Sequence, residues 1–129
     1  MINVKELRIG SVIRSSLTKQ PHTVTGVLPL NGKYVIYTSL QTSYSDPADW
    51  EPVELNPDIL RRANFRNSQS KYFVIDLTDS SAQGQIEYYK GNCFVVGWDE
   101  ERVGEPIESL HQLQNVYLSL SGKELIINL

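Results

Sequence analysis

Few residues of the chain have the types and spacing that catalysis requires. A nucleophilic enzyme needs a serine or cysteine beside a histidine base, and the chain has two histidines, His22 and His111, and one cysteine, Cys93. Cys93 begins the apolar run CFVV, which favours a buried and inert thiol. His111 falls near the start of a predicted helix, on its polar side, which indicates a surface or cap-region residue. We therefore predict no catalytic residues and a protein that is not an enzyme.

Metal and cofactor motifs are also missing from the sequence. The two histidines and single cysteine do not have the spacing of zinc ligands. The run Asp99-Glu100-Glu101 lacks the glycine and alternating oxygen ligands of a calcium loop and indicates a solvated loop. Neither a dinucleotide-binding nor a phosphate-binding glycine pattern occurs. We expect no metal and no cofactor.

Binding is the better-supported class of function. A small basic cluster lies on the predicted mid-chain helix and just after it: Arg61, Arg62, Arg66 and Lys71. Aromatic residues that could stack beside it are Tyr44, Trp50, Tyr72, Tyr88 and Tyr89. Cations combined with aromatic rings bind single-stranded nucleic acid. A nucleic-acid contact at this cluster is one hypothesis, and a solvated helix face with ordinary sheet aromatics is the simpler one.

Composition restricts the class of protein. A chain of 129 residues with 40% hydrophobic and 21% charged residues fits a single packed domain, 1–129. The net charge of −3 argues against a dominant surface for nucleic acid or anionic membrane. One cysteine excludes an intrachain disulfide. With no apolar signal segment and no long apolar run, we expect a cytoplasmic protein and no membrane partner.

The clearest predicted helix covers about residues 110–121. Ser109 and Gln112 have the spacing of a capping box, and Gly122 supplies the left-handed residue that ends a helix. The apolar side chains of this helix lie within one arc of its surface: Leu110, Leu113, Val116, Tyr117 and Leu120. This arc is wide enough to cover one side of a core.

Leu118 lies outside that arc, beside His111 and Gln114 on the polar side of the helix. A leucine there needs cover, which we expect from a returning strand at 124–128. The alternative is a symmetric contact with a second subunit through His111, Gln114 and Leu118. In that alternative the protein associates with a second copy of itself through the C-terminal helix.

The remaining segments predict hairpins and a second helix. Asn31-Gly32 suits a type I′ turn between strands 23–28 and 33–40, and Gly91-Asn92 indicates a second hairpin of strands 85–89 and 93–98. Further strands are expected near 12–13 and at 71–77.

A short helix is predicted after Asn56, its N-cap, with Pro57 at its first position and Asn64 as its stop. The fold class is thus α+β: antiparallel hairpins of about six to seven strands, with two helices packed on the sheet.

One short pattern occurs twice. Glu51-Pro52-Val53-Glu54 and Glu105-Pro106-Ile107-Glu108 each follow predicted strands and precede a helix. This suggests two similar β3α halves, 1–65 and 66–129, although chance recurrence explains the pattern more simply.

Three motifs together resemble a known family. They are LRIGSV (7–12), EPVELNPDILRRANF (51–65) and HQLQNVYLSLSGKEL (111–125). In this order they are similar to small uncharacterised proteins of Bacteroides-type bacteria and their phages. Departures from the family pattern, such as Ser11 for asparagine and Asn56 for threonine, keep the same capping chemistry.

That resemblance implies relatives but no activity. LRIGSVI is also similar to the start of small SH3-like barrels. We therefore expect a non-catalytic accessory or protein-interaction protein, associated with phages or mobile elements, whose partner is unknown. A nucleic-acid-binding module is the alternative.

Overall fold

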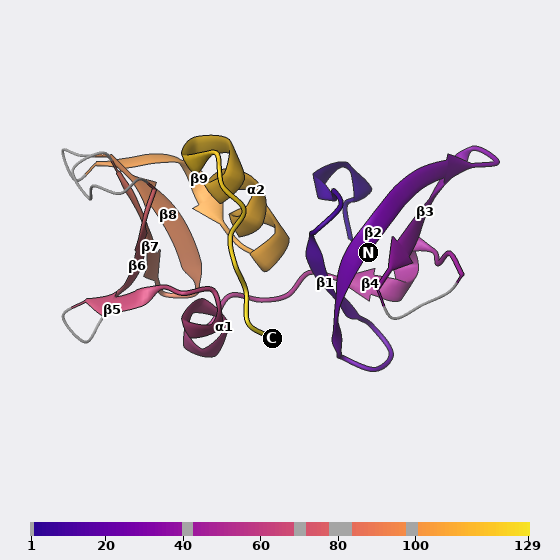
Figure 1. The fold of residues 1–129 in the computed structure, drawn as a ribbon, viewed down its shortest axis with the longest axis horizontal. Coiled ribbons are helices and arrows are strands. Elements are labelled where there is room, and N and C mark those ends of the chain that lie inside the picture. Colours follow the sequence, from indigo (N-terminus) through magenta and orange to yellow (C-terminus); the bar gives the residue numbers. More distant parts are fainter. Residues whose placement is uncertain (1, 40–42, 69–71, 78–83, 98–100) are drawn as a thin grey trace. The chain divides into compact units, whose positions relative to one another are not determined.

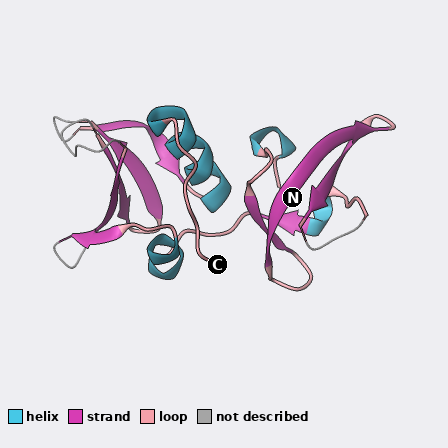
Figure 2. Cartoon of the chain, in the orientation of Figure 1, coloured by secondary structure: helices cyan, strands magenta, loops and turns pink. Residues whose placement is uncertain are grey.

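The computed structural model describes residues 2–39, 43–68, 72–77, 84–97 and 101–129. In these residues nine strands form two antiparallel sheets, accompanied by two α-helices and two short 3-10 helices (Figures 1 and 2). The chain divides into two compact units, Met1–Val53 and Glu54–Leu129. The predicted α+β class is confirmed, although there are more strands than expected. No helix in the described ranges is long and apolar enough to span a membrane.

The first unit is built on a four-stranded sheet with the order β3-β2-β1-β4. Its elements are η1 (Val4–Glu6), β1 (Val12–Ser15), β2 (Pro21–Leu30), β3 (Lys33–Thr38), η2 (Pro47–Asp49) and β4 (Trp50–Glu51). The strands β2 and β3 form a long hairpin that extends beyond the other strands (Figure 1).

The turn of this hairpin follows from its sequence. Asn31 and Gly32 have φ of 51° and 80°, the two left-handed positions of a type I′ turn, as predicted. Pro29 lies opposite Tyr34 and lacks an N–H group, which restricts where it fits in a ladder. A bulge at Thr25 shifts the register between Val24 and Gly26, so one extra residue separates the two ends of β2.

One face of the first sheet forms its core. The buried cluster consists of Ile2, Ile13, Val24, Ile36 and Trp50. Because side chains alternate along a strand, the same alternation that buries Val24 and Ile36 turns their neighbours to the opposite face.

The second unit is a five-stranded meander with the order β5-β6-β7-β8-β9. Its elements are α1 (Pro57–Arg62), β5 (Arg66–Ser68), β6 (Tyr72–Asp76), β7 (Gln85–Tyr89), β8 (Asn92–Val96), β9 (Arg102–Ile107) and α2 (Leu110–Ser121). Both helices lie on the same side of this sheet (Figure 1). Strand residues Phe73, Ile86 and Cys93 and helix residues Leu60, Leu110 and Leu113 are buried in this unit.

The predicted limits of both helices are confirmed. Asn56 Oδ1 accepts the N–H of Ile59 at 3.0 Å, and Asn64 has φ of 68° just beyond α1. Gly122 ends α2 with φ of 75° and donates its N–H to Leu118 O. These short-range signals suffice because capping is a local interaction.

The predicted capping box of α2 is wrong. Ser109 is the N-cap but makes no side-chain capping bond. Gln112 Oε1 instead accepts the N–H of Glu108 at 3.1 Å, one residue before the N-cap. The Ser109 hydroxyl lies 3.4 Å from His111 Nδ1. The side chain of Ser109 therefore contacts His111 in place of a backbone N–H of the first helical turn.

Two strands lie where none was predicted from the sequence. They are β5, just after α1, and β9, which follows the Asp99-Glu100-Glu101 run and includes most of the Glu-Pro-Ile-Glu motif. β9 is an edge strand, where Pro106 is tolerated, and its register shifts opposite β8 with Gly104 at φ of 80°. The expected strand at 124–128 does not form.

The second turn and the repeat also differ from expectation. The left-handed pair is Lys90-Gly91, with φ of 49° and 94°, and not Gly91-Asn92. The two sheets have different strand orders, and the boundary between the units falls before α1. The topology therefore shows no repeated β3α unit.

Candidate functional site

The predicted basic cluster is largely neutralised by neighbouring side chains. Arg62 Nε lies 3.1 Å from Asp58 Oδ2, and Arg66 Nη2 lies 3.1 Å from Asp76 Oδ1. The Arg61 guanidinium lies 5.2 Å from the centre of the Phe73 ring. Lys71 falls outside the described residues. Two of the three described arginines thus have an ion-pair partner.

The charge of the second unit also opposes nucleic-acid binding. Residues 54–129 carry seven basic and eleven acidic side chains, a net charge of −4. A polyanion would meet this acidic unit mainly with repulsion. Of the expected stacking residues, Trp50 is buried and Tyr44 belongs to the first unit. Tyr88 packs edge-on against Phe73, the ring on which Arg61 lies.

The expected contact patch on α2 is mostly covered. His111 and Gln114 are 0% and 3% exposed, whereas the sequence placed His111 on the polar surface of the helix. Leu118 is half-buried, and Leu120, expected on the apolar arc, is 51% exposed. The buried side of α2 is therefore rotated toward His111. Hydrophobicity alone could not reveal this, because hydrogen-bonded polar side chains can also be buried.

The potential nucleophile and ligands are dispersed. The predicted burial of Cys93 is confirmed, and this burial raises the pKa of its thiol to about 12. His22 packs edge-on against Trp50, with ring centres 4.8 Å apart, and its Nδ1 lies 3.2 Å from Thr38 Oγ1. The described residues contain no group of three side chains that could hold a metal.

The LRIGS motif forms a tight turn at the start of the first unit. Ser11 N donates to Arg8 O at 3.0 Å, closing a four-residue turn in which Gly10 has φ of 99°. A positive φ at this third position is typical of a type II turn and favours glycine. The Ser11 hydroxyl accepts the N–H of Arg8 at 3.0 Å. The turn leaves Ile9 71% exposed.

The hairpin beside this turn presents an apolar face to solvent. We define the outer face as Leu28, Leu30, Val35, Tyr37 and Tyr44. Leu28 pairs with Val35 across the hairpin, and the Tyr37 and Tyr44 rings meet edge-on at 6.4 Å. Leu28, Leu30 and Tyr44 remain 51%, 40% and 55% exposed, whereas Val35 between them is buried at 8%. This face lies opposite the core because side chains alternate along each strand.

Gly26 lies beside the aromatic part of the outer face. It pairs with Tyr37, and a Cβ placed on Gly26 would lie 3.7 Å from Tyr37 Cδ2. That separation is an ordinary van der Waals contact, so an alanine at position 26 would touch the Tyr37 ring without displacing it.

Two hollows adjoin the outer face. A groove of about 560 Å³ is lined by Leu7, Arg8, Ile9, Thr25, Gly26, Val27, Leu28 and Tyr37. A smaller recess of about 280 Å³ is lined by Leu30, Asn31, Lys33, Tyr34, Val35, Tyr44 and Asp46. The surface is therefore hollowed on both sides of the Leu28–Leu30 ridge.

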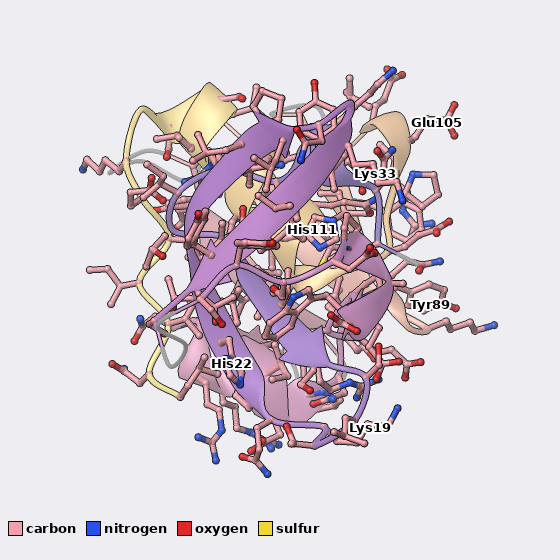
Figure 3. The ribbon with its side chains drawn as sticks, turned by 90° about the vertical axis from the view of Figure 1, so that its right-hand side faces the viewer. Lys19, His22, Lys33, Tyr89, Glu105 and His111 are labelled. Atoms are coloured by element: carbon pink, nitrogen blue, oxygen red, sulfur yellow. The ribbon has the colours of Figure 1, made fainter. Side chains whose placement is uncertain are left out.

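Few charged side chains line this surface. Lys33 and Asp46 line the smaller recess, and Arg8 is the one charged residue of the groove. Lys33 lies toward the β2–β3 end of the first unit, and Lys19 marks the opposite end (Figure 3). The first unit carries five basic and four acidic side chains. Contact at the outer face would therefore be mainly apolar.

The sequence contained a partial signal for this site. Leu28, Leu30, Val35 and Tyr37 alternate with residues of the other face, but both faces are apolar. Such a pattern predicts a strand buried on both sides, and only the fold shows that one side is open.

A comparison with protein-family models, curated proteins and solved structures found no match.

Proposed function

We propose that the protein is a non-catalytic interaction protein whose first unit binds a partner protein through the outer face. The exposure of Leu28, Leu30 and Tyr44 next to an apolar groove carries this proposal. Soluble proteins rarely leave contiguous apolar patches open, and such patches are typical of binding sites.

We take the partner to be a different protein. In a symmetric pair of this chain, outer-face side chains of each copy would instead have to enter the groove of the other copy. A partner that projects aliphatic or aromatic side chains would fill the groove. Because the surface has few charges, we expect this contact to persist at high salt.

The resemblance to proteins of Bacteroides-type bacteria and phages supports an accessory role in the bacterial cytoplasm. Partners would then be phage or host proteins. This assignment rests on the three motifs at 7–12, 51–65 and 111–125.

Nucleic-acid binding is the second candidate, and one observation favours it. Arg61 stacks on Phe73 and has no carboxylate partner among the described residues. A stacked guanidinium can bind a phosphate or a base. The pairing of Arg62 and Arg66 with carboxylates places this candidate second.

A quantitative pull-down from the bacterial host tests the proposal. The bait proteins are the wild type, Leu28→Asp with Tyr44→Asp, and Leu17→Asp as matched control, since Leu17 is 91% exposed in the β1–β2 loop. We expect the wild type and the control to capture the same partner, and the double variant to lose it. Equal capture by all three folded proteins would contradict the proposal.

A further inference from the structure

A second cluster of cations and aromatic rings lies on the second unit, apart from the predicted arginines. Lys90 Nζ and Arg102 Cζ each lie 5.2 Å from the centre of the Tyr89 ring. Arg102 Cζ also lies 4.2 Å from the centre of the Phe94 ring. Lys90 Nζ and Arg102 Cζ are therefore separated by at most twice 5.2 Å.

Three strands build this cluster. Tyr89 ends β7 and Phe94 lies in β8, with Glu87 opposite Phe94, while Arg102 begins β9 opposite Val96. By strand alternation these side chains lie on the sheet face opposite Cys93 and Ile86. Tyr89 is 37% exposed and is labelled in Figure 3. The site is open to solvent.

Among the described residues, Lys90 and Arg102 lack the carboxylate partners that four other basic residues have. Arg14 and Lys19 share Glu51, and Arg62 and Arg66 pair with Asp58 and Asp76. No carboxylate pairs with Lys90 or Arg102 in the described part of the chain, although Glu87 lies on the same face. Two like charges beside one ring repel each other. A bound anion would relieve that repulsion.

The turn at Lys90 requires a positive φ, which is unfavourable for a lysine. Lys90 has φ of 49° at the first left-handed position of its type I′ turn, where asparagine, aspartate or glycine is favoured. The β2–β3 turn of this chain uses Asn31 at the same position. Lys19 is also left-handed, but its ammonium is bound by Glu51 at 2.9 Å. Strain kept at a residue with an unpaired charge points to a role in binding.

We propose that Tyr89, Lys90, Phe94 and Arg102 form a binding site for a phosphate group on a small ligand. The guanidinium of Arg102, held by two rings, offers paired N–H donors that match phosphate oxygens. Lys90 supplies the second positive charge. A phosphomonoester carries nearly two negative charges at neutral pH, which matches two cations better than a single carboxylate does. The net charge of −4 on this unit favours a small ligand over a nucleic-acid strand.

Amide NMR titration of the full chain tests this site. The probes are inorganic phosphate, 5′-AMP and a short single-stranded oligonucleotide, each at matched ionic strength with chloride as reference. We expect phosphate and 5′-AMP to shift the amides of residues 89–94 and 102 in a saturable way. Arg102→Gln should weaken binding about tenfold or more, as loss of a charge-assisted hydrogen bond does. Arg61→Gln is the matched control, because Arg61 also stacks on one ring.

Lys90→Asn separates binding from structure. Asparagine relieves the strain of the left-handed turn, so this variant should unfold at a higher urea concentration while binding phosphate about tenfold or more weakly. A merely structural lysine would not give that combination. Unshifted amides with phosphate, undiminished binding in Lys90→Asn, or tighter binding of the oligonucleotide than of 5′-AMP would each overturn the proposal.

Discussion

The indole nitrogen of Trp50 donates a hydrogen bond of 2.8 Å to Ser45 Oγ. The same hydroxyl donates to Ile36 O at 2.8 Å, and the backbones of Ser45 and Ile36 exchange two further hydrogen bonds of 2.8 Å. Trp50 is 1% exposed. One serine thus satisfies the buried indole and fastens the segment carrying Tyr44 to the edge strand β3.

Ser45→Ala should destabilise the first unit. The buried indole N–H would lose its partner, which costs about 1–3 kcal/mol of unfolding free energy. Urea unfolding monitored by Trp50 fluorescence, with Trp98→Phe as background, measures this loss. Ser43→Ala is the control, since Ser43 is exposed. Equal midpoints for the two variants would show that the indole bond does not matter to stability.

How much of this arrangement the sequence predicts depends on how local each interaction is. Asn31-Gly32, the Asn56 cap and the Gly122 stop were predictable because each depends on a few neighbouring residues. β9 was not, because its strand character comes from pairing with β8 across a bulge at Gly104. Propensity does not contain that long-range contribution.

The candidate site was less predictable than the fold. Arg62 and Arg66 look like a basic patch until the structure places Asp58 and Asp76 beside them. His111 looks exposed on a helical wheel but is buried. Conversely, Leu28 alternates among apolar residues as in a strand buried on both faces, yet it is 51% exposed. Only the assembled sheet shows which apolar residues lack cover.

The ion pairs of Glu51 with Arg14 and Lys19 predict that the folded protein loses stability as pH falls. The hydrogen bond from Lys19, followed by the contribution of Arg14, holds the pKa of Glu51 below its usual range despite partial burial. A lowered folded pKa adds stability above the unfolded pKa, and this stability is lost as pH falls through the folded pKa. Urea midpoints of wild type and Glu51→Gln should therefore differ at neutral pH and converge in acid. A constant difference across that range would exclude this linkage.

The buried thiol of Cys93 predicts that the folded protein loses stability at high pH. Its folded pKa of about 12 lies above the ordinary 9.0, so the folded protein disfavours the thiolate. Its contribution to stability is complete below about pH 9 and declines as pH rises toward about 12, reaching a loss of about 2 kcal/mol near pH 10.5. Urea unfolding at about pH 8 and 10.5 should show a larger decrease for wild type than for Cys93→Ala. Identical decreases would show that the thiol does not ionise on unfolding.

Gel-shift titration at low and high salt tests the second candidate function. Because the second unit has a net charge of −4 and Arg62 and Arg66 are paired, we expect no salt-sensitive binding of DNA or RNA, single- or double-stranded. Binding that falls with salt and is lost in Arg61→Ala with Arg62→Ala would instead promote the nucleic-acid hypothesis and locate its surface.

Site-specific photo-crosslinking in cells that express the protein tests the interaction surface most directly. A photoreactive amino acid would replace Leu28, Leu17 or Arg61 in turn, since all three positions are exposed. We predict a nuclease-resistant adduct with one partner protein from position 28, and none from positions 17 and 61. No specific adduct at position 28, or a nuclease-sensitive adduct at position 61, would contradict the assignment of the outer face as the binding surface.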